Sequence, residues 1–152
     1  MNNGSMFADL TKYRSLSFYR QNPTIEFSTL YKKSIYKVYA VFVLNASKAD
    51  DNGYIYNISR RNFINDEDFE SWSGEAYERS LINTGVDVTK EDNIITLVTC
   101  VYDFDDARLV VMARETREGE DETVDTSLSR ANPSPRYPKR WYDDRGAAYP
   151  FN

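Results

Sequence analysis

The chain has 152 residues, a length that suits one domain large enough to bury a hydrophobic core. Its composition, 41% hydrophobic and 28% charged, is ordinary for a globular protein, and its formal net charge of −5 argues against a nucleic-acid backbone as partner. The single cysteine excludes an internal disulfide and a cysteine-rich metal site.

The N-terminal part is predicted to be helical. Residues 4–14 carry apolar side chains at helical spacing, and Ser5 can cap the helix that they form. These apolar side chains are Met6, Leu10 and Tyr13. A shorter helical turn is predicted for residues 17–21, since Pro23 disfavours helix at the residue before it. A short strand over residues 24–27 follows.

Residues 36–45 give the strongest strand signal in the chain. They are rich in β-branched and aromatic side chains, which suit a pleated strand. Strict alternation places one apolar set on each face: Val38, Ala40, Phe42 and Leu44 on the first, and Tyr39, Val41 and Val43 on the second. We therefore expect this strand to be covered on both sides.

A loop over residues 46–53 follows this strand and ends in the turn sequence Asp-Asn-Gly. Its carboxylates at Asp50 and Asp51 suggest calcium as an alternative, but the ligand spacing of an EF-hand loop is not met. We expect no metal and no cofactor.

The clearest helix is predicted for residues 65–83. Asn65 can cap it, an acidic first turn complements its dipole, and Gly85 follows its C-terminus. Its buried stripe is predicted to consist of Phe69, Trp72 and Ala76. Trp72 is therefore interpreted as a core residue rather than a binding residue.

Two apolar runs in the region 94–114 flank a short acidic loop. The first run ends in Cys100, and Arg108 opens the second. If the runs pair as neighbouring strands, Arg108 returns close to Cys100, where a guanidinium favours a thiolate and can hold a developing oxyanion. The alternative is a buried structural cysteine. The loop between the runs carries three carboxylates, those of Asp103, Asp105 and Asp106. Either they raise the pKa of the thiol, or they are simply solvated.

This arrangement resembles the sortases, the cysteine transpeptidases of Gram-positive cell surfaces, and within them class B. Residues 96–100 read Thr-Leu-Val-Thr-Cys, which matches the family signature, and Arg108 matches the family's catalytic arginine. Further similarity extends over residues 2–7, 40–43, 51–54 and 132–138. The resemblance implies a mainly β fold, the C-terminal half of a sortase-type β-barrel with flanking α-helices.

The resemblance also implies a chemistry. Cys100 would be the nucleophile and Arg108 would steady the oxyanion, while Leu97 and Thr99 would line the peptide groove. For Leu97 and Thr99, ordinary packing of strand residues is the alternative. The expected substrate is a sorting-signal peptide of the type Asn-Pro-x-Thr-x. Its acceptor would be an amine of the cell-wall (peptidoglycan) precursor, or a pilin lysine.

One departure from the family is serious, because the chain contains no histidine. The resemblance places the catalytic histidine just before the segment matched by residues 1–7. No apolar run of about 18 residues occurs either, although sortases usually carry an N-terminal membrane anchor. We therefore expect an N-terminally truncated sortase domain over residues 1–152 that is inactive alone. Its full-length form is expected at the extracellular face of the bacterial membrane.

Within this domain, helices and barrel strands are expected up to about residue 114. Residues 115–125 are rich in charge and are predicted to be a solvated segment. The remaining residues combine proline with aromatic side chains, which a disordered tail would lack, so we expect an extended coil that docks on the body.

Two other functions stay open on the sequence alone. A non-catalytic module could keep the groove for the sorting signal and lack the chemistry. A cysteine hydrolase with papain-like logic is disfavoured, since it also needs a histidine and gives Arg108 no role.

Overall fold

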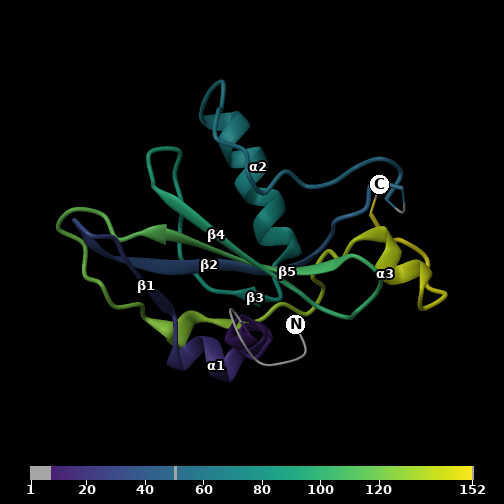
Figure 1. Cartoon of the computed structure of the whole chain (residues 1–152), viewed down its shortest axis with the longest axis horizontal. Coiled ribbons are helices and arrows are strands. Elements are labelled where there is room, and N and C mark those ends of the chain that lie inside the picture. The colour runs from purple at the N-terminus through teal and green to yellow at the C-terminus, as the bar shows by residue number, and fades with distance from the viewer. Residues whose placement is uncertain (1–7, 50, 152) are drawn as a thin grey trace.

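The computed structural model describes residues 8–49 and 51–151. A four-stranded antiparallel sheet with the strand order β1-β2-β5-β4 forms its centre (Figure 1). Its strands are β1 (Thr24–Ser28), β2 (Lys33–Asn45), β4 (Ile94–Cys100) and β5 (Ala107–Glu115). The helices are η1 (Ala8–Arg14), α1 (Leu16–Gln21), α2 (Asp66–Arg79), η2 (Thr126–Leu128) and α3 (Lys139–Asp143). The prediction of a mainly β fold with flanking helices is confirmed.

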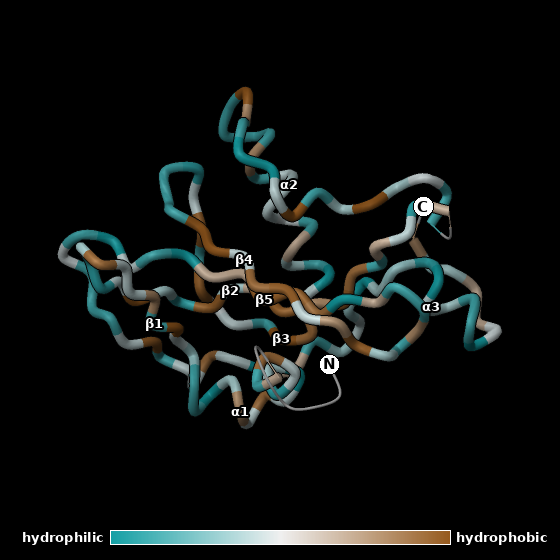
Figure 2. The backbone as a smooth tube through the Cα atoms, in the orientation of Figure 1, coloured by the Kyte–Doolittle hydropathy of each residue, from teal (hydrophilic) through white to brown (hydrophobic). Residues whose placement is uncertain are grey.

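Both faces of the central sheet are covered, as predicted from β2. One apolar cluster lies between the sheet and the N-terminal helices, and includes Leu10, Tyr13 and Tyr19. The other lies between the sheet and α2, and includes Phe69 and Trp72. Figure 2 shows the hydrophobic residues concentrated along the central strands. Trp72 is a core residue, as predicted.

The predicted assignment of side chains to the two faces of β2 is wrong at its start. The register between β2 and β5 shifts between Val38 and Ala40, which marks a β-bulge. One extra residue reverses the alternation, so Val38 lies in the first cluster together with Val41. Tyr39 and Ala40, although adjacent, both lie in the second cluster.

Residues 8–14 form the 3-10 helix η1, with Leu10 and Tyr13 buried as predicted. The predicted cap at Ser5 and the side chain of Met6 lie outside the described residues. The next helix, α1, begins one residue earlier than expected and is capped by Ser15, whose side chain accepts a hydrogen bond from the Phe18 amide. In the described part of the chain, no helix is both long and apolar enough to cross a membrane.

Helix α2 begins where the sequence predicts and ends earlier. The Asn65 side chain accepts a hydrogen bond of 2.9 Å from the Asp68 amide. The helix ends at Arg79 because Ser80 is extended, and its hydroxyl accepts a hydrogen bond from the Val41 amide. The next residues form strand β3 (Ile82–Asn83), which pairs with β6 (Arg130–Ala131). The predicted helix end at residue 83 is therefore wrong.

The cap of α2 gives a direct test of this local structure. Asn65→Ala removes the acceptor for one of the unpaired amides of the first turn, so we expect the free energy of unfolding to fall by about 1 kcal/mol. Asn62→Ala, at an exposed position just before the helix, is the matched control. Chemical denaturation of both variants provides the measurement, and equal stabilities would contradict this role of Asn65.

The C-terminal segment lies along the body of the protein. The Asn132 amide donates to the Leu81 carbonyl and the Arg136 amide to the Glu78 carbonyl, each at 2.9 Å. Tyr137 and Trp141 stack on one another and pack against the first cluster. The segment also contains β6 and the helix α3, which the sequence did not predict.

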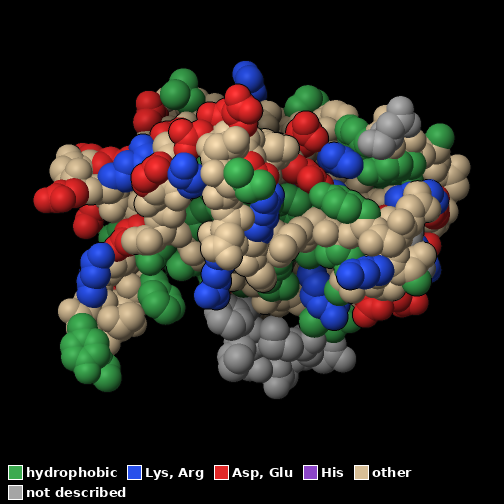
Figure 3. Space-filling model, turned by 90° about the horizontal axis from the view of Figure 1, so that it is seen from above, with side chains coloured by type: hydrophobic (Ala, Val, Ile, Leu, Met, Phe, Trp, Pro, Cys, Tyr) green, Lys and Arg blue, Asp and Glu red, His purple; other side chains and the backbone are tan. Residues whose placement is uncertain are grey.

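The charged segment after β5 is not simply solvated, which corrects the prediction for residues 115–125. Arg114 at the end of β5 is only 2% exposed, and its guanidinium donates two hydrogen bonds to Glu120, at 2.7 and 2.8 Å. Arg117 binds the carboxylate of Asp92 at 2.8 and 2.7 Å. Hydrogen bonding to Arg114 is the largest cause that lowers the pKa of Glu120. On the face drawn in Figure 3, acidic and basic side chains are likewise intermixed.

Candidate active site at Cys100

The candidate site is built on the pair of strands that the sequence predicted. β4 and β5 are antiparallel, and their register places Cys100 directly opposite Arg108. Directly opposite residues project from the same face of a sheet, with Cα atoms about 4.5–5.5 Å apart. The connecting turn is held by hydrogen bonds of 3.2 Å from the Val101 amide to the Ala107 carbonyl and from the Ala107 amide to the Phe104 carbonyl.

The Cys100 thiol is free and exposed, which rules out the alternative of a buried structural cysteine. The Arg108 side chain is 31% exposed, and its Nη1 donates to its neighbour's carbonyl, that of Ala107, at 2.9 Å. Its Nη2 lies 3.9 Å from a carboxylate oxygen of Asp106. Within the described residues, no hydrogen bond joins the guanidinium to the thiol. The structure thus brings the two side chains to one face of the sheet without a hydrogen bond between them.

The other two predicted site residues occupy the opposite face of β4. Leu97 is paired with Val111 and packs against the first apolar cluster. Thr99 is paired with Leu109 and is 5% exposed. Thr99 also lines the hollow described below, together with Cys100. The predicted role of both residues in a peptide groove stays a prediction, and the packing of Leu97 matches the alternative given above.

A hollow of about 440 Å³ lies beside the thiol. One wall comes from η1, through Ala8, Thr11 and Arg14. The other wall comes from the end of β4 and the turn that follows it: Thr99, Cys100, Val101, Tyr102 and Asp103. The hollow is large enough for several atoms of a peptide, and its lining includes Cys100 but not Arg108.

Arg14 is a residue of this site that the sequence did not reveal. Its Nη2 donates a hydrogen bond of 2.6 Å to Asp103, whose side chain is 12% exposed. This ion pair ties η1 to the turn that follows Cys100, so Asp103 is not a freely solvated carboxylate. The two residues lie 89 positions apart, and no local pattern could have connected them.

Neither a histidine nor a metal site can be assigned here. The whole sequence contains no histidine. Among residues 8–49 and 51–151, no group of three or more potential ligands is arranged to hold a metal ion. The calcium alternative involved Asp50, which lies outside the described residues.

The chain and its fold have relatives among known proteins. A sequence model described as "Sortase domain" matches residues 1–116. The chain belongs to the sortase family. Its relatives place it in class B: it is 36% identical over 112 residues to sortase B of Staphylococcus aureus, and 32% identical over 119 residues to sortase B of Listeria monocytogenes.

Solved sortase B structures share the fold. A structure of Clostridium perfringens sortase B is 32% identical, has a TM-score of 0.63, and is matched over 77% of this chain and 61% of its own. A Staphylococcus aureus sortase B–substrate complex is 32% identical with a TM-score of 0.63, over 77% of this chain and 51% of the other. The predicted sortase-type β architecture is therefore confirmed.

This sortase chain covers only part of its relatives. The two sequence matches cover 72% and 75% of this chain, but only 43% and 44% of the two curated sortase B proteins. The residues after 116 lie beyond the family match.

Proposed function

We propose that this chain carries the nucleophile of a class B sortase reaction, a transpeptidation in two acyl transfers. The Cys100 sulfur attacks a backbone carbonyl of a sorting signal of the type Asn-Pro-x-Thr-x. The C–N bond breaks, the amine leaves with a proton, and a thioester remains. An acceptor amine then attacks the thioester and forms a new amide, while the thiol is regenerated.

The observation that carries this proposal is the pairing of an exposed cysteine with an arginine on the same face of the sheet. Cys100 also lines a hollow. Oxyanion stabilisation needs a donor aimed at the carbonyl oxygen that becomes negatively charged. Arg108 Nη1 now donates to the Ala107 carbonyl. A rotation of this partly exposed side chain would turn it toward the substrate.

The chain has no histidine to protonate the leaving amine, so we propose that this proton donor is supplied by another polypeptide segment. Arg108 cannot supply the proton, since a guanidinium keeps it at any physiological pH. We infer that a histidine-bearing segment packs near η1, which forms one wall of the hollow. This inference fits the share of the sortase B relatives that the chain leaves unmatched.

The proposed partners follow from what the structural relatives bind. Sortase B has been solved as a substrate complex and in complex with triglycine. A triglycine peptide offers an amine of the kind that a cell-wall precursor would present. The proposal therefore assigns a surface-protein sorting signal as acyl donor and a peptidoglycan amine as acceptor, at the extracellular face of the membrane.

The test is a transfer assay with an Asn-Pro-x-Thr-x peptide and triglycine. We expect no transfer by the 152-residue chain alone, and transfer once a polypeptide with the histidine-bearing part of a sortase B domain is added. Binding of the peptide without any transfer in the mixture would instead support the non-catalytic module. Turnover by the chain alone would show that another group donates the proton.

A further inference from the structure

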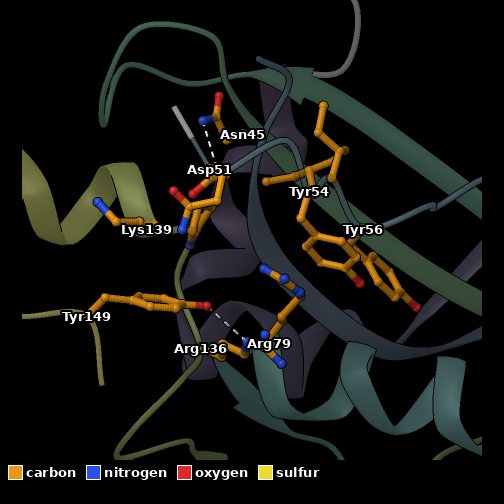
Figure 4. A pocket seen from close by; sticks show the side chains of 12 residues that line it. Asn45, Asp51, Tyr54, Tyr56, Arg79, Arg136, Lys139 and Tyr149 are labelled. Atoms are coloured by element: carbon orange, nitrogen blue, oxygen red, sulfur yellow. Dashed lines mark hydrogen bonds between the residues drawn. The ribbon is translucent and has the colours of Figure 1, made fainter. Parts of the chain in front are cut away.

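A second cavity, separate from the hollow at Cys100, lies where the C-terminal segment meets the end of β2 (Figure 4). Its volume is about 320 Å³, in the size range of small-molecule pockets. Leu44 and Asn45 of β2, the loop 51–56 and Arg79 at the end of α2 form one side. Arg136, Lys139 and Tyr149 are contributed by the C-terminal segment.

Two guanidinium groups meet in this pocket. Figure 4 shows the side chains of Arg79 and Arg136, which come from different parts of the chain, between Tyr149 on one side and Tyr54 and Tyr56 on the other. The Arg79 side chain is 5% exposed and that of Arg136 is 19% exposed. Two guanidinium groups that line one cavity can both donate hydrogen bonds to an anion placed between them.

Each guanidinium has one terminal nitrogen that is free to donate a hydrogen bond to a ligand. Arg79 uses Nε and Nη2 to bind Glu75, at 3.0 and 2.8 Å. Arg136 uses Nε toward the Tyr149 hydroxyl and Nη1 toward Glu78. Within the described residues, Nη1 of Arg79 and Nη2 of Arg136 make no hydrogen bond. Two such donors from separate arginines match the two oxygens of one carboxylate.

The charge around the pocket sets the charge of the ligand. Arg79, Arg136 and Lys139 each already pair with a carboxylate: Glu75, Glu78 and Asp143. Asp51 also lines the cavity and accepts hydrogen bonds from Asn45 and from the Arg140 amide. Three cations thus face four carboxylates, so the lining carries no net positive charge, which disfavours a doubly charged phosphate. A single carboxylate would be held by hydrogen bonds from the two free guanidinium nitrogens.

The remaining walls are aromatic and apolar. The Tyr54 hydroxyl donates a hydrogen bond of 2.7 Å to Glu75, and the Tyr56 hydroxyl donates one of 2.8 Å to the Trp72 carbonyl. Because both hydroxyls are already bonded, these two tyrosines contribute mainly apolar ring surface to the pocket. Burial, the largest cause, raises the pKa of Tyr54 to about 12, so this phenol adds no negative charge to the pocket at neutral pH.

We propose that this pocket binds a small monocarboxylate with an aromatic or branched apolar body. The carboxylate lies against Arg79 and Arg136, and the body fills the space between Tyr54, Tyr56 and Tyr149. Four of the lining residues lie after residue 116, beyond the part that matches the sortase domain: Arg136, Pro138, Lys139 and Tyr149. The site is thus a property of this chain's C-terminal segment, and it does not depend on the transpeptidation proposed above.

The test compares phenylacetate with phenylacetamide, which has the same shape without the charge, by NMR titration of the whole chain. We expect saturable shifts at the pocket residues and at least about tenfold weaker binding of the amide, because it loses charge-assisted hydrogen bonds. Arg136→Gln should weaken phenylacetate binding to a similar extent. Arg145→Gln removes the same charge from an exposed residue of the same segment, outside the pocket lining, and should leave binding unchanged.

Two further measurements show which kind of carboxylate binds and whether the result depends on a variant that folds. An acetylated tripeptide that ends in Phe, with a free or an amidated C-terminus, shows whether a peptide end or only a free acid is accepted. Binding of either supports the site. The comparison of phenylacetate with phenylacetamide uses the parent chain, so it tests the proposal even if the Arg136→Gln variant is unstable. Equal affinity for acid and amide, or shifts outside the pocket only, would overturn the proposal.

Discussion

Cys100→Ala is expected to lower the rate of transfer in the reconstituted assay by about 10³-fold or more. The variant removes the only thiol in the chain, so no thioester can form and the reaction must proceed without its covalent intermediate. Arg108→Ala should cost about 10²–10³-fold, the usual effect of losing one oxyanion donor. The measurement is the initial rate of peptide transfer to triglycine.

Two controls separate catalysis from folding in this experiment. Thermal melts should be the same for Cys100→Ala and the parent chain, since the thiol is exposed. In the Arg108→Ala variant, labelling of Cys100 by a small thiol reagent should still go to completion. Transfer that persists in Cys100→Ala would disprove the assignment of the nucleophile, and an unchanged rate in Arg108→Ala would remove Arg108 from the site.

Glu120→Ala is expected to lower the free energy of unfolding by about 3 kcal/mol. Arg114 is almost fully buried, and the substitution removes the carboxylate that binds it through two hydrogen bonds. A buried charge left without its main partner typically costs about 3–5 kcal/mol. We place the value at the low end because Asp87 still binds Arg114. Chemical denaturation measures the difference.

The matched control is Glu122→Ala, an exposed carboxylate in the same segment, which should change stability by less than about 0.5 kcal/mol. A loss of equal size in both variants would contradict the role given to Arg114.

The carboxylates that follow Arg114 also predict a pH dependence of stability. Hydrogen bonding, first of all from Lys32, lowers the pKa of Glu115 from 4.5 to about 2. A carboxylate with a lowered folded-state pKa stabilises the fold fully above its unfolded value, and this contribution is lost as the pH falls toward the folded value. We therefore expect the melting temperature to fall between about pH 4.5 and pH 2. The fall should be less steep in Glu120→Ala, because hydrogen bonding to Arg114 also lowers the pKa of Glu120 and the variant lacks this contribution.

Much of the candidate site could be predicted from the sequence. Two apolar β-type runs around a short turn predicted neighbouring strands, and the place of Cys100 and Arg108 at their facing ends predicted their pairing. The cap at Asn65 and the two-sided burial of β2 were equally local signals. Caps and side-chain periodicity act over a few residues, so the sequence displays them directly.

The tertiary structure decided the features that depend on distant partners. The bulge at Tyr39 depends on how β2 pairs with β5, and the early end of α2 depends on Ser80 binding the backbone of β2. The ion pair between Arg14 and Asp103 joins segments 89 residues apart. The pocket around Arg79 and Arg136 forms only because the C-terminal segment returns to the end of β2. Such contacts arise when the chain satisfies buried charges and backbone groups across the whole fold, which no local pattern records.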